Sequence, residues 1–212
     1  MTLIILNATI PSYKIASRNK LDWGPQCIDL KGDPRPAQLE AALVEEMRKH
    51  GWTAKNNERE ICTKAVEMMH DKKYGLAYSD YMAKPQINII KFQQEIETEK
   101  KAAHPDQRKI QQLENNIHKA SDFLAKESDA RKGPLSRIKP NDLVCNQQSA
   151  VLSVVLHHVG IENDFCMGIG RSSTLRHAFL QTKKGSIVES TDPNAPYLEN
   201  LNNKRISKGE IV

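Results

Sequence analysis

The chain has 212 residues and 39% of them are hydrophobic, enough for one sizeable core or for a catalytic domain with an added subdomain. The formal net charge is +5, but lysine and arginine are interleaved with aspartate and glutamate along most of the sequence, which is typical of a solvated surface. No RNA- or DNA-binding motif is present, so we expect no nucleic-acid partner.

The apolar start of the chain, residues 2–6, does not predict a leader or an anchor. It has no basic region before it and is too short for a signal peptide, and no later run is long enough to span a bilayer. We therefore expect a cytosolic protein without a membrane partner. The sequence leaves open whether that cytosol is the producer's or a host's, because specialised secretion systems deliver proteins that lack such a leader.

Residues 1–135 predict a mainly helical region. The stretch up to Pro36 is rich in proline, glycine, aspartate and serine, which is typical of irregular structure. After it, apolar residues recur at helical spacing up to a stop at Gly51, namely Leu39, Leu43 and Met47. A second amphipathic helix is expected over residues 57–70.

Residues 86–130 predict an antiparallel helical hairpin. They are highly polar and are interrupted by Ala103-His104-Pro105-Asp106. On both sides of this break the apolar residues follow spacings of three and four, which indicates a narrow seam between two helices: Ile89, Phe92 and Ile96, then Ile110, Leu113, Ile117, Ala120 and Leu124. The hairpin either supports the core or protrudes as a partner-binding arm, which makes it a candidate partner-binding surface.

A change of composition near Gly133-Pro134 predicts a boundary between the helical part and a second part, residues 136–212. The two parts are either separate subdomains or one integrated domain. Beyond it we expect a helix and then three short strands, at about 142–158, 164–168, 175–182 and 186–189. The tail after Tyr197 is polar and is expected to be irregular.

The four cysteines are far apart and form no CxxC pair, so neither a zinc site nor a disulfide scaffold is predicted: Cys27, Cys62, Cys145 and Cys166. We expect free thiols, no metal and no cofactor. Cys62 and Cys166 fall inside a predicted helix and a predicted strand, where a cysteine usually packs as a small hydrophobic residue.

Cys145 is in a different position, because it falls in the first turn of a predicted helix. Asn141 or Asp142 can cap that helix. Free N–H groups and the positive end of the helix dipole favour an anion there, and a thiolate is an anion. The apolar side of the helix predicts that it is buried and holds the cysteine rigidly. Cys145 is therefore the candidate nucleophile.

A general base and a group that orients it follow on the predicted strands. If Lys184-Gly185 is a two-residue hairpin loop, residue 183 pairs with residue 186, and His177 lies opposite Asp192. A carboxylate in that position can accept a hydrogen bond from one imidazole nitrogen and leave the other facing the thiol. The spacing thus predicts a catalytic triad of Cys145, His177 and Asp192.

Residues 141–194 resemble the transglutaminase-like superfamily of papain-type thiol enzymes. The family pattern is a cysteine that begins a helix, Leu-x-x-x-Gly-Ile at its end, a strand, His-Ala-aromatic, and a strand ending in Asp-Pro. The matching segments follow in this order: Cys145, Leu156 to Ile161, Phe165 to Gly168, His177-Ala178-Phe179 and Asp192-Pro193. The resemblance implies an α+β fold in which a nucleophile helix packs on a small antiparallel sheet, with an N-terminal helical part.

By this resemblance Cys145 is the nucleophile, His177 the general base and acid, and Asp192 the orienting carboxylate. The implied reaction is thiol-dependent acyl transfer from protein amides. Small members with an added helical part resemble bacterial effectors that modify host proteins, so we favour a protein glutamine deamidase or transglutaminase. A cysteine peptidase with the same triad and a non-catalytic protein-binding module that uses the helical hairpin are the alternatives.

Several features leave the substrate open. Asn146 and Asn194 stand where the family often has an aromatic residue and a threonine. No acidic loop typical of a calcium site is present, so an animal-type, calcium-activated enzyme is not expected. Arylamine N-acetyltransferases share the order Cys, His, Asp, but residues 138–144 lack the arginine- and glycine-rich sequence that usually precedes the nucleophile in those enzymes.

The oxyanion of the reaction needs hydrogen-bond donors. The backbone N–H of Cys145 is one expected donor, and the candidates for a second are Gln26, Gln147 and Gln148.

Overall fold

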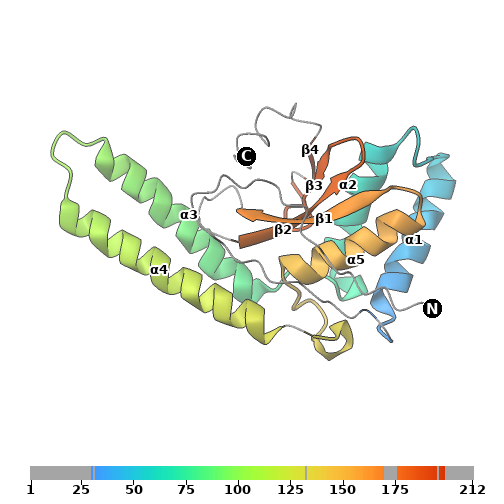
Figure 1. Ribbon diagram of the computed structural model, residues 1–212, viewed down its shortest axis with the longest axis horizontal. Helices are drawn as coiled ribbons and strands as arrows, with labels where there is room; N and C mark the ends of the chain where they lie inside the picture. Colours follow the sequence, from blue (N-terminus) through green and yellow to red (C-terminus); the bar gives the residue numbers. More distant parts are fainter. Residues whose placement is uncertain (1–29, 31, 132, 170–175, 195, 199–212) are drawn as a thin grey trace.

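The computed structural model describes residues 30, 32–131, 133–169, 176–194 and 196–198 (Figure 1). Within these ranges the chain is an α+β protein, in which five α-helices accompany one antiparallel sheet of four strands in the order β1-β2-β3-β4. The expectations for the first 29 residues, including Gln26 and Cys27, lie outside the described residues. No helix in the described ranges is long and apolar enough to cross a membrane.

The first two helices form as the apolar spacing predicts. Helix α1 covers Arg35–His50 and helix α2 covers Glu58–His70. Gly51 ends α1 with φ 67°, and the N–H of Trp52 returns to the carbonyl of Met47 at 2.9 Å, a capping geometry that glycine adopts without steric cost. A short 3₁₀ turn, Lys72–Tyr74, follows α2.

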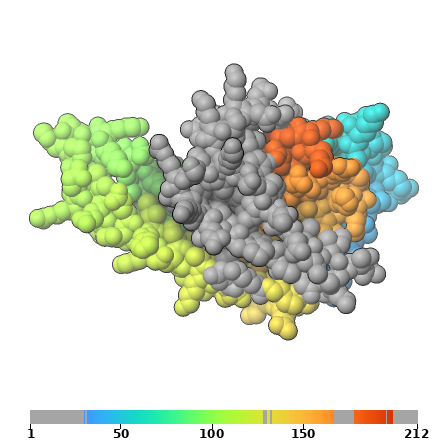
Figure 2. Space-filling view, viewed as in Figure 1, coloured from blue at the N-terminus to red at the C-terminus, as the bar shows by residue number. Residues whose placement is uncertain are grey.

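The predicted helical hairpin is present. Helix α3 covers Asp80–Lys100 and helix α4 covers Gln107–Ala130, so α3 begins six residues earlier than expected. The two helices extend to one side of the molecule (Figure 1; green in Figure 2). Their outer seam is a cluster of Ile96, Ile110 and Leu113. At the base, Met82, Ile89 and Leu124 pack with Val144, the residue before Cys145.

Helix α5, Cys145–His158, is the most buried of the five described helices, since every residue from Cys145 to Ser153 is buried. It contacts α1, α2 and the first two strands. A 3₁₀ turn, Leu135–Arg137, lies on the chain before it. The main hydrophobic cluster includes Leu43 of α1, Leu152 of α5 and Leu180 of β2. That cluster has members on both sides of residue 135, and the division into 1–135 and 136–212 stays a prediction.

The strands lie close to their expected positions, but the β2–β3 register differs from the predicted one. The strands are β1 Asn163–Ile169, β2 Arg176–Thr182, β3 Ile187–Val188 and β4 Tyr197–Leu198. Strand β4 differs from the expectation, because the chain after Tyr197 is predicted to be irregular. Tyr197 and Leu198 pair with Val188 and Ile187.

The predicted two-residue loop at Lys184-Gly185 is wrong. Gln181 pairs with Ile187, and the N–H of Thr182 donates to the carbonyl of Ser186 at 2.8 Å, so the loop has three residues, 183–185. Gly185 occupies the left-handed region with φ 85°, as the last residue of a three-residue hairpin loop commonly does. The extra residue shifts every pair by one position, and β3 ends at Val188, so the predicted direct pairing of His177 with Asp192 does not form.

Candidate functional site

Cys145 is the first residue of α5, as its position in the sequence predicts, but the helix begins about three residues later than expected. Val144, with extended φ −117° and ψ 174°, precedes the helix in the capping position. The first-turn N–H groups and the positive end of the helix dipole therefore lie at the thiol. This is the environment in which a thiolate is stabilised.

Neither residue predicted as the cap serves in that role. The side chain of Asn141 is occupied by backbone, since its Oδ1 accepts from the N–H of Ala77 and its Nδ2 donates to the carbonyl of Lys72. Asp142 accepts hydrogen bonds from Ser79 and Arg131. Both side chains thus fasten the segment before Cys145 to other parts of the chain.

The segment that leads to Cys145 runs parallel to residues 77–79. Leu143 forms a parallel bridge with Tyr78, and the N–H of Ser79 donates to its carbonyl at 2.8 Å. Cys145 is 9% exposed, and its thiol donates to Oδ1 of Asn146 at 3.6 Å. The thiol therefore has a fixed backbone on one side and restricted access to solvent.

Ser149 connects the three chain segments that carry the predicted triad. It lies one turn beyond Cys145 on α5 and is fully buried. Its hydroxyl donates to the carbonyl of Ala178, the residue after His177, at 3.0 Å, and it lies 2.8 Å from the hydroxyl of Ser190, two residues before Asp192. A hydroxyl has one proton, so Ser190 is the donor in the second bond. The sequence signal for Ser149 is its i+4 spacing from Cys145, which places both residues on one helix face.

The structure places the other two triad members only in part. The backbone of His177 pairs with Gly168 of β1, while its imidazole lies outside the described part of the structure. Asp192 is partly buried, and its Oδ1 accepts a hydrogen bond from the N–H of Asn194 at 2.9 Å, which makes a tight turn. The catalytic roles of the three residues stay a prediction.

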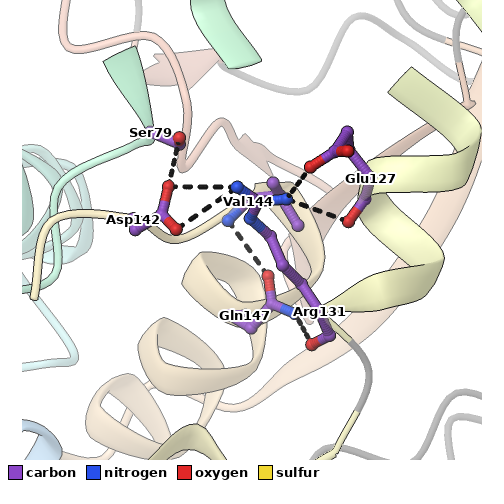
Figure 3. Close-up of polar contacts among 6 residues, drawn as sticks. All are labelled: Ser79, Glu127, Arg131, Asp142, Val144 and Gln147. Carbon is purple, nitrogen blue, oxygen red and sulfur yellow. Dashed lines mark hydrogen bonds and ion pairs between the residues drawn. The ribbon is translucent and has the colours of Figure 1, made fainter. Parts of the chain in front are cut away.

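The side chains of Gln147 and Gln148 form hydrogen bonds with backbone groups of this chain (Figure 3 shows Gln147). Nε2 of Gln147 donates to the carbonyl of Arg131 at 2.8 Å, and its Oε1 accepts from the N–H of Val144 at 3.0 Å. Nε2 of Gln148 donates to the carbonyl of Leu76 at 3.0 Å. Each amide nitrogen thus donates to a backbone carbonyl, which argues against either side chain as the second oxyanion donor. The third candidate, Gln26, lies outside the described residues.

Tyr78 is a neighbour of Cys145 that local sequence patterns do not identify. Its hydroxyl oxygen accepts a hydrogen bond from Nε2 of Gln86 at 2.6 Å. Burial raises the pKa of the Tyr78 phenol above its usual range, and a negative charge on Cys145 raises this pKa further. The phenol therefore stays protonated at neutral pH and adds no negative charge beside the thiol.

The other described thiols differ from Cys145. Cys62, in the middle of α2, and Cys166, in β1, are fully buried, in agreement with their interpretation as packing residues. Burial raises the pKa of the Cys62 thiol far above its usual range, and the negative charge of Glu58 adds to this increase. Within the described ranges, no three His, Cys, Asp or Glu side chains lie close enough to hold a metal ion.

Comparisons of this chain with protein-family models, curated proteins and solved structures find no match. Family membership therefore supports no role for Cys145 or for the helical hairpin.

The Ser149 contacts can be tested by Ser149→Ala. Loss of the buried hydroxyl leaves the Ala178 carbonyl and Ser190 without this partner, at an expected cost of about 1–3 kcal/mol in the free energy of unfolding, measured by chemical denaturation. Ser153→Ala is the matched control, because Ser153 donates to Asn163 at 2.7 Å one turn farther along α5. Both variants should lose stability, but only Ser149→Ala should slow alkylation of Cys145. Equal alkylation rates in the two variants would contradict a role of Ser149 in the site.

Proposed function

We propose that this chain is a thiol-dependent acyl-transfer enzyme acting on protein amides, with a transglutaminase-like or papain-like core. Cys145 is the nucleophile, His177 the general base and acid, and Asp192 the orienting carboxylate. The observation that supports this most strongly is the arrangement around α5. Cys145 begins a buried helix, and Ser149, one turn later, binds the chain beside His177 and the chain shortly before Asp192.

The reaction follows from these roles. The Cys145 thiolate attacks the amide carbonyl carbon, and the backbone N–H of Cys145 stabilises the oxyanion. Collapse of the tetrahedral intermediate breaks the carbon–nitrogen bond, and the imidazolium of His177 gives its proton to the leaving amine or ammonia. Water attacks the resulting thioester to form an acid, or a second amine attacks to form a new amide. Either step restores the thiol.

We favour a glutamine side chain as the substrate amide, which makes the protein a deamidase or a transglutaminase. This preference rests on analogy alone, because small members of the transglutaminase-like superfamily with an added helical part resemble bacterial effectors that modify host proteins. If a backbone amide is the substrate instead, the same triad makes the protein a cysteine peptidase. The helix-start position of Cys145 supports both reactions equally.

The test is to incubate the purified chain with glutamine-rich acceptor proteins such as casein, with and without a primary amine. Intact-mass and peptide spectra distinguish the three products: the acid, the amine conjugate and the cleaved chain. We expect one product with the wild type and with Cys166→Ser, and none with Cys145→Ala. If Cys145→Ala forms the same product, or if no candidate protein is changed by the wild type, the proposal is wrong.

A second candidate is a binding module that uses the hairpin. It is favoured by the exposure of two isoleucines on α3, Ile87 at 51% and Ile90 at 45%, on a hairpin that extends to one side of the molecule (Figure 2). In this case Ile87→Asp with Ile90→Asp should abolish capture of a protein partner, while Cys145→Ala should leave the cellular effect unchanged. Loss of the cellular effect in Cys145→Ala would exclude the hypothesis of a non-catalytic binding module.

A further inference from the structure

The two ends of the helical hairpin meet on a single carboxylate, Asp142, three residues before Cys145 (Figure 3). Ser79, the residue before α3, donates its hydroxyl hydrogen bond to Oδ1 of Asp142. Arg131, the residue after α4, donates from Nη2 to both oxygens of Asp142 at 3.2 Å. The hairpin is thus fastened at both ends to the segment that leads to the proposed nucleophile.

Gln147 provides a second connection between the end of α4 and the start of α5. It is the third residue of α5, and its side chain binds at both of its ends. Nε2 donates to the Arg131 carbonyl, and Oε1 accepts from the N–H of Val144, the residue before the helix. A displacement of Arg131 therefore acts on the backbone beside Cys145. Val144 also belongs to the apolar cluster at the base of the hairpin.

Charge compensation at this point depends on Arg131. Its guanidinium lies 2.8 Å from Glu127 and 3.2 Å from Asp142, and the Arg131 side chain is only 13% exposed. Burial alone would lower the pKa of Arg131, but the hydrogen bonds to Glu127 and Asp142 outweigh it and hold the pKa above its usual value. Without this cation, two carboxylates would remain close to the end of α5 at which the thiolate forms, and like charges repel most where water is scarce.

We propose that Arg131 is a positioning residue that couples the base of the helical hairpin to the first turn of α5, fixing the backbone at Cys145 and neutralising Glu127 and Asp142. The inference rests on the proposed nucleophilic role of Cys145. It gives the hairpin a role in the reaction, because a protein that binds the hairpin and displaces α4 changes the reactivity of the thiol. Arg131 does not touch the reacting atoms and acts through Asp142, Gln147 and Val144.

The test compares Arg131→Met with Arg108→Met, a matched control on the exposed outer end of α4. Two measurements are made on each protein: the rate of Cys145 alkylation by iodoacetamide, and hydrogen exchange of the backbone amides of residues 143–148. In Arg131→Met we expect alkylation of Cys145 near neutral pH to be about fivefold slower than in Arg108→Met, because the two carboxylates that bind Arg131 then lack their cation. Exchange at the start of α5 should be faster in Arg131→Met only.

A rescue separates charge compensation from general loss of structure. Asp142→Asn removes one of the two carboxylates, so Arg131→Met with Asp142→Asn should react faster with iodoacetamide than Arg131→Met alone. A purely structural role of Arg131 predicts that Cys145 alkylation is slower still in the double variant. If Arg131→Met does not fold, Arg131→Lys is used instead, because lysine keeps the positive charge but cannot bind Glu127 and Asp142 together as the guanidinium does. In Arg131→Lys we expect Cys145 alkylation to be slower than in the wild type by less than fivefold, and exchange at the start of α5 to be faster than in the wild type.

The outcomes distinguish this inference from the proposed function. If Arg131→Met matches Arg108→Met in both measurements while the wild-type thiol is reactive, the role of Arg131 is overturned and the enzyme proposal stands. If the wild-type Cys145 reacts no faster than glutathione, the enzyme proposal fails, and hydrogen exchange alone decides whether Arg131 positions the start of α5. Exchange that is the same in both variants overturns the coupling in either case.

Discussion

Replacing His177 by alanine is expected to lower turnover of the substrate amide on the order of 10⁴-fold or more, because no other group then takes the thiol proton and returns it to the leaving amine. Steady-state turnover of the modified protein, measured by mass spectrometry, reports the effect. His157→Ala is the matched control, since His157 is exposed at the far end of α5 from Cys145. We expect no loss of turnover in His157→Ala.

Asp192→Asn tests the third member of the triad without disturbing the local fold. An asparagine keeps an oxygen that can accept the N–H of Asn194, the bond that forms the turn, but it has no negative charge to stabilise an imidazolium. Turnover should fall by about 10²- to 10⁴-fold. Full turnover in Asp192→Asn, with strong loss in His177→Ala, would reduce the triad to a dyad. Equal turnover in His177→Ala and His157→Ala would remove His177 from the mechanism.

The second large effect is on stability and concerns the buried ion pair of Asp33 and Arg35. Arg35 contacts Asp33 at 2.6 Å and also donates to the carbonyls of Gly75 and Leu135 at 3.0 and 2.7 Å. Arg35→Met leaves the 4%-exposed Asp33 without its partner, so the free energy of unfolding should fall by about 3–5 kcal/mol, measured by chemical denaturation. Arg48→Met, which breaks the fully exposed pair with Glu45 at 2.6 Å, should cause no measurable loss.

The stabilisation by this pair should also depend on pH. Burial alone would raise the pKa of Asp33, but the hydrogen bonds and charge of Arg35 outweigh burial and lower the pKa below its ordinary value. A lowered carboxyl pKa means that the contribution is fully present above the unfolded-state pKa of about 4 and is lost as the pH falls through the folded-state value. The wild type and Arg35→Met should therefore converge in stability in acid. A difference that is constant from neutral to acid pH would contradict this role.

Much of the helical architecture could be predicted from the sequence, because it depends on local spacing. Leu39 and Leu43 mark the buried side of α1 and Gly51 marks its end, and the alternation of three and four defines the seam of the hairpin. The start of α5 could not be placed as accurately. Asn141 and Asp142 are good capping residues, but their side chains bind partners up to 69 residues away, and such contacts are invisible to local rules.

The geometry of the site was predictable only in outline. The expected position of Cys145 in the first turn of a helix depended on capping by Asn141 or Asp142. The structure has Cys145 at the helix start, but with Val144 in the capping position. The pairing of His177 with Asp192 depended on a loop length of two residues, and Lys-Lys-Gly is equally compatible with the three-residue loop that forms. A difference of one residue changes every opposed pair. Contacts made by Ser149, Tyr78 and Arg131 depend on tertiary packing and have no local signal strong enough to predict them.

The central claim is that Cys145 is an activated thiol, and alkylation of the native protein by iodoacetamide near neutral pH tests it most directly. Peptide mapping resolves the four cysteines. Cys62 and Cys166 are both fully buried, so their labelling rates report how often the folded structure opens. We expect Cys145 to be labelled before the other thiols and to be labelled more slowly in His177→Ala. Equal labelling of all four cysteines, or a Cys145 rate unchanged in His177→Ala, would contradict the account.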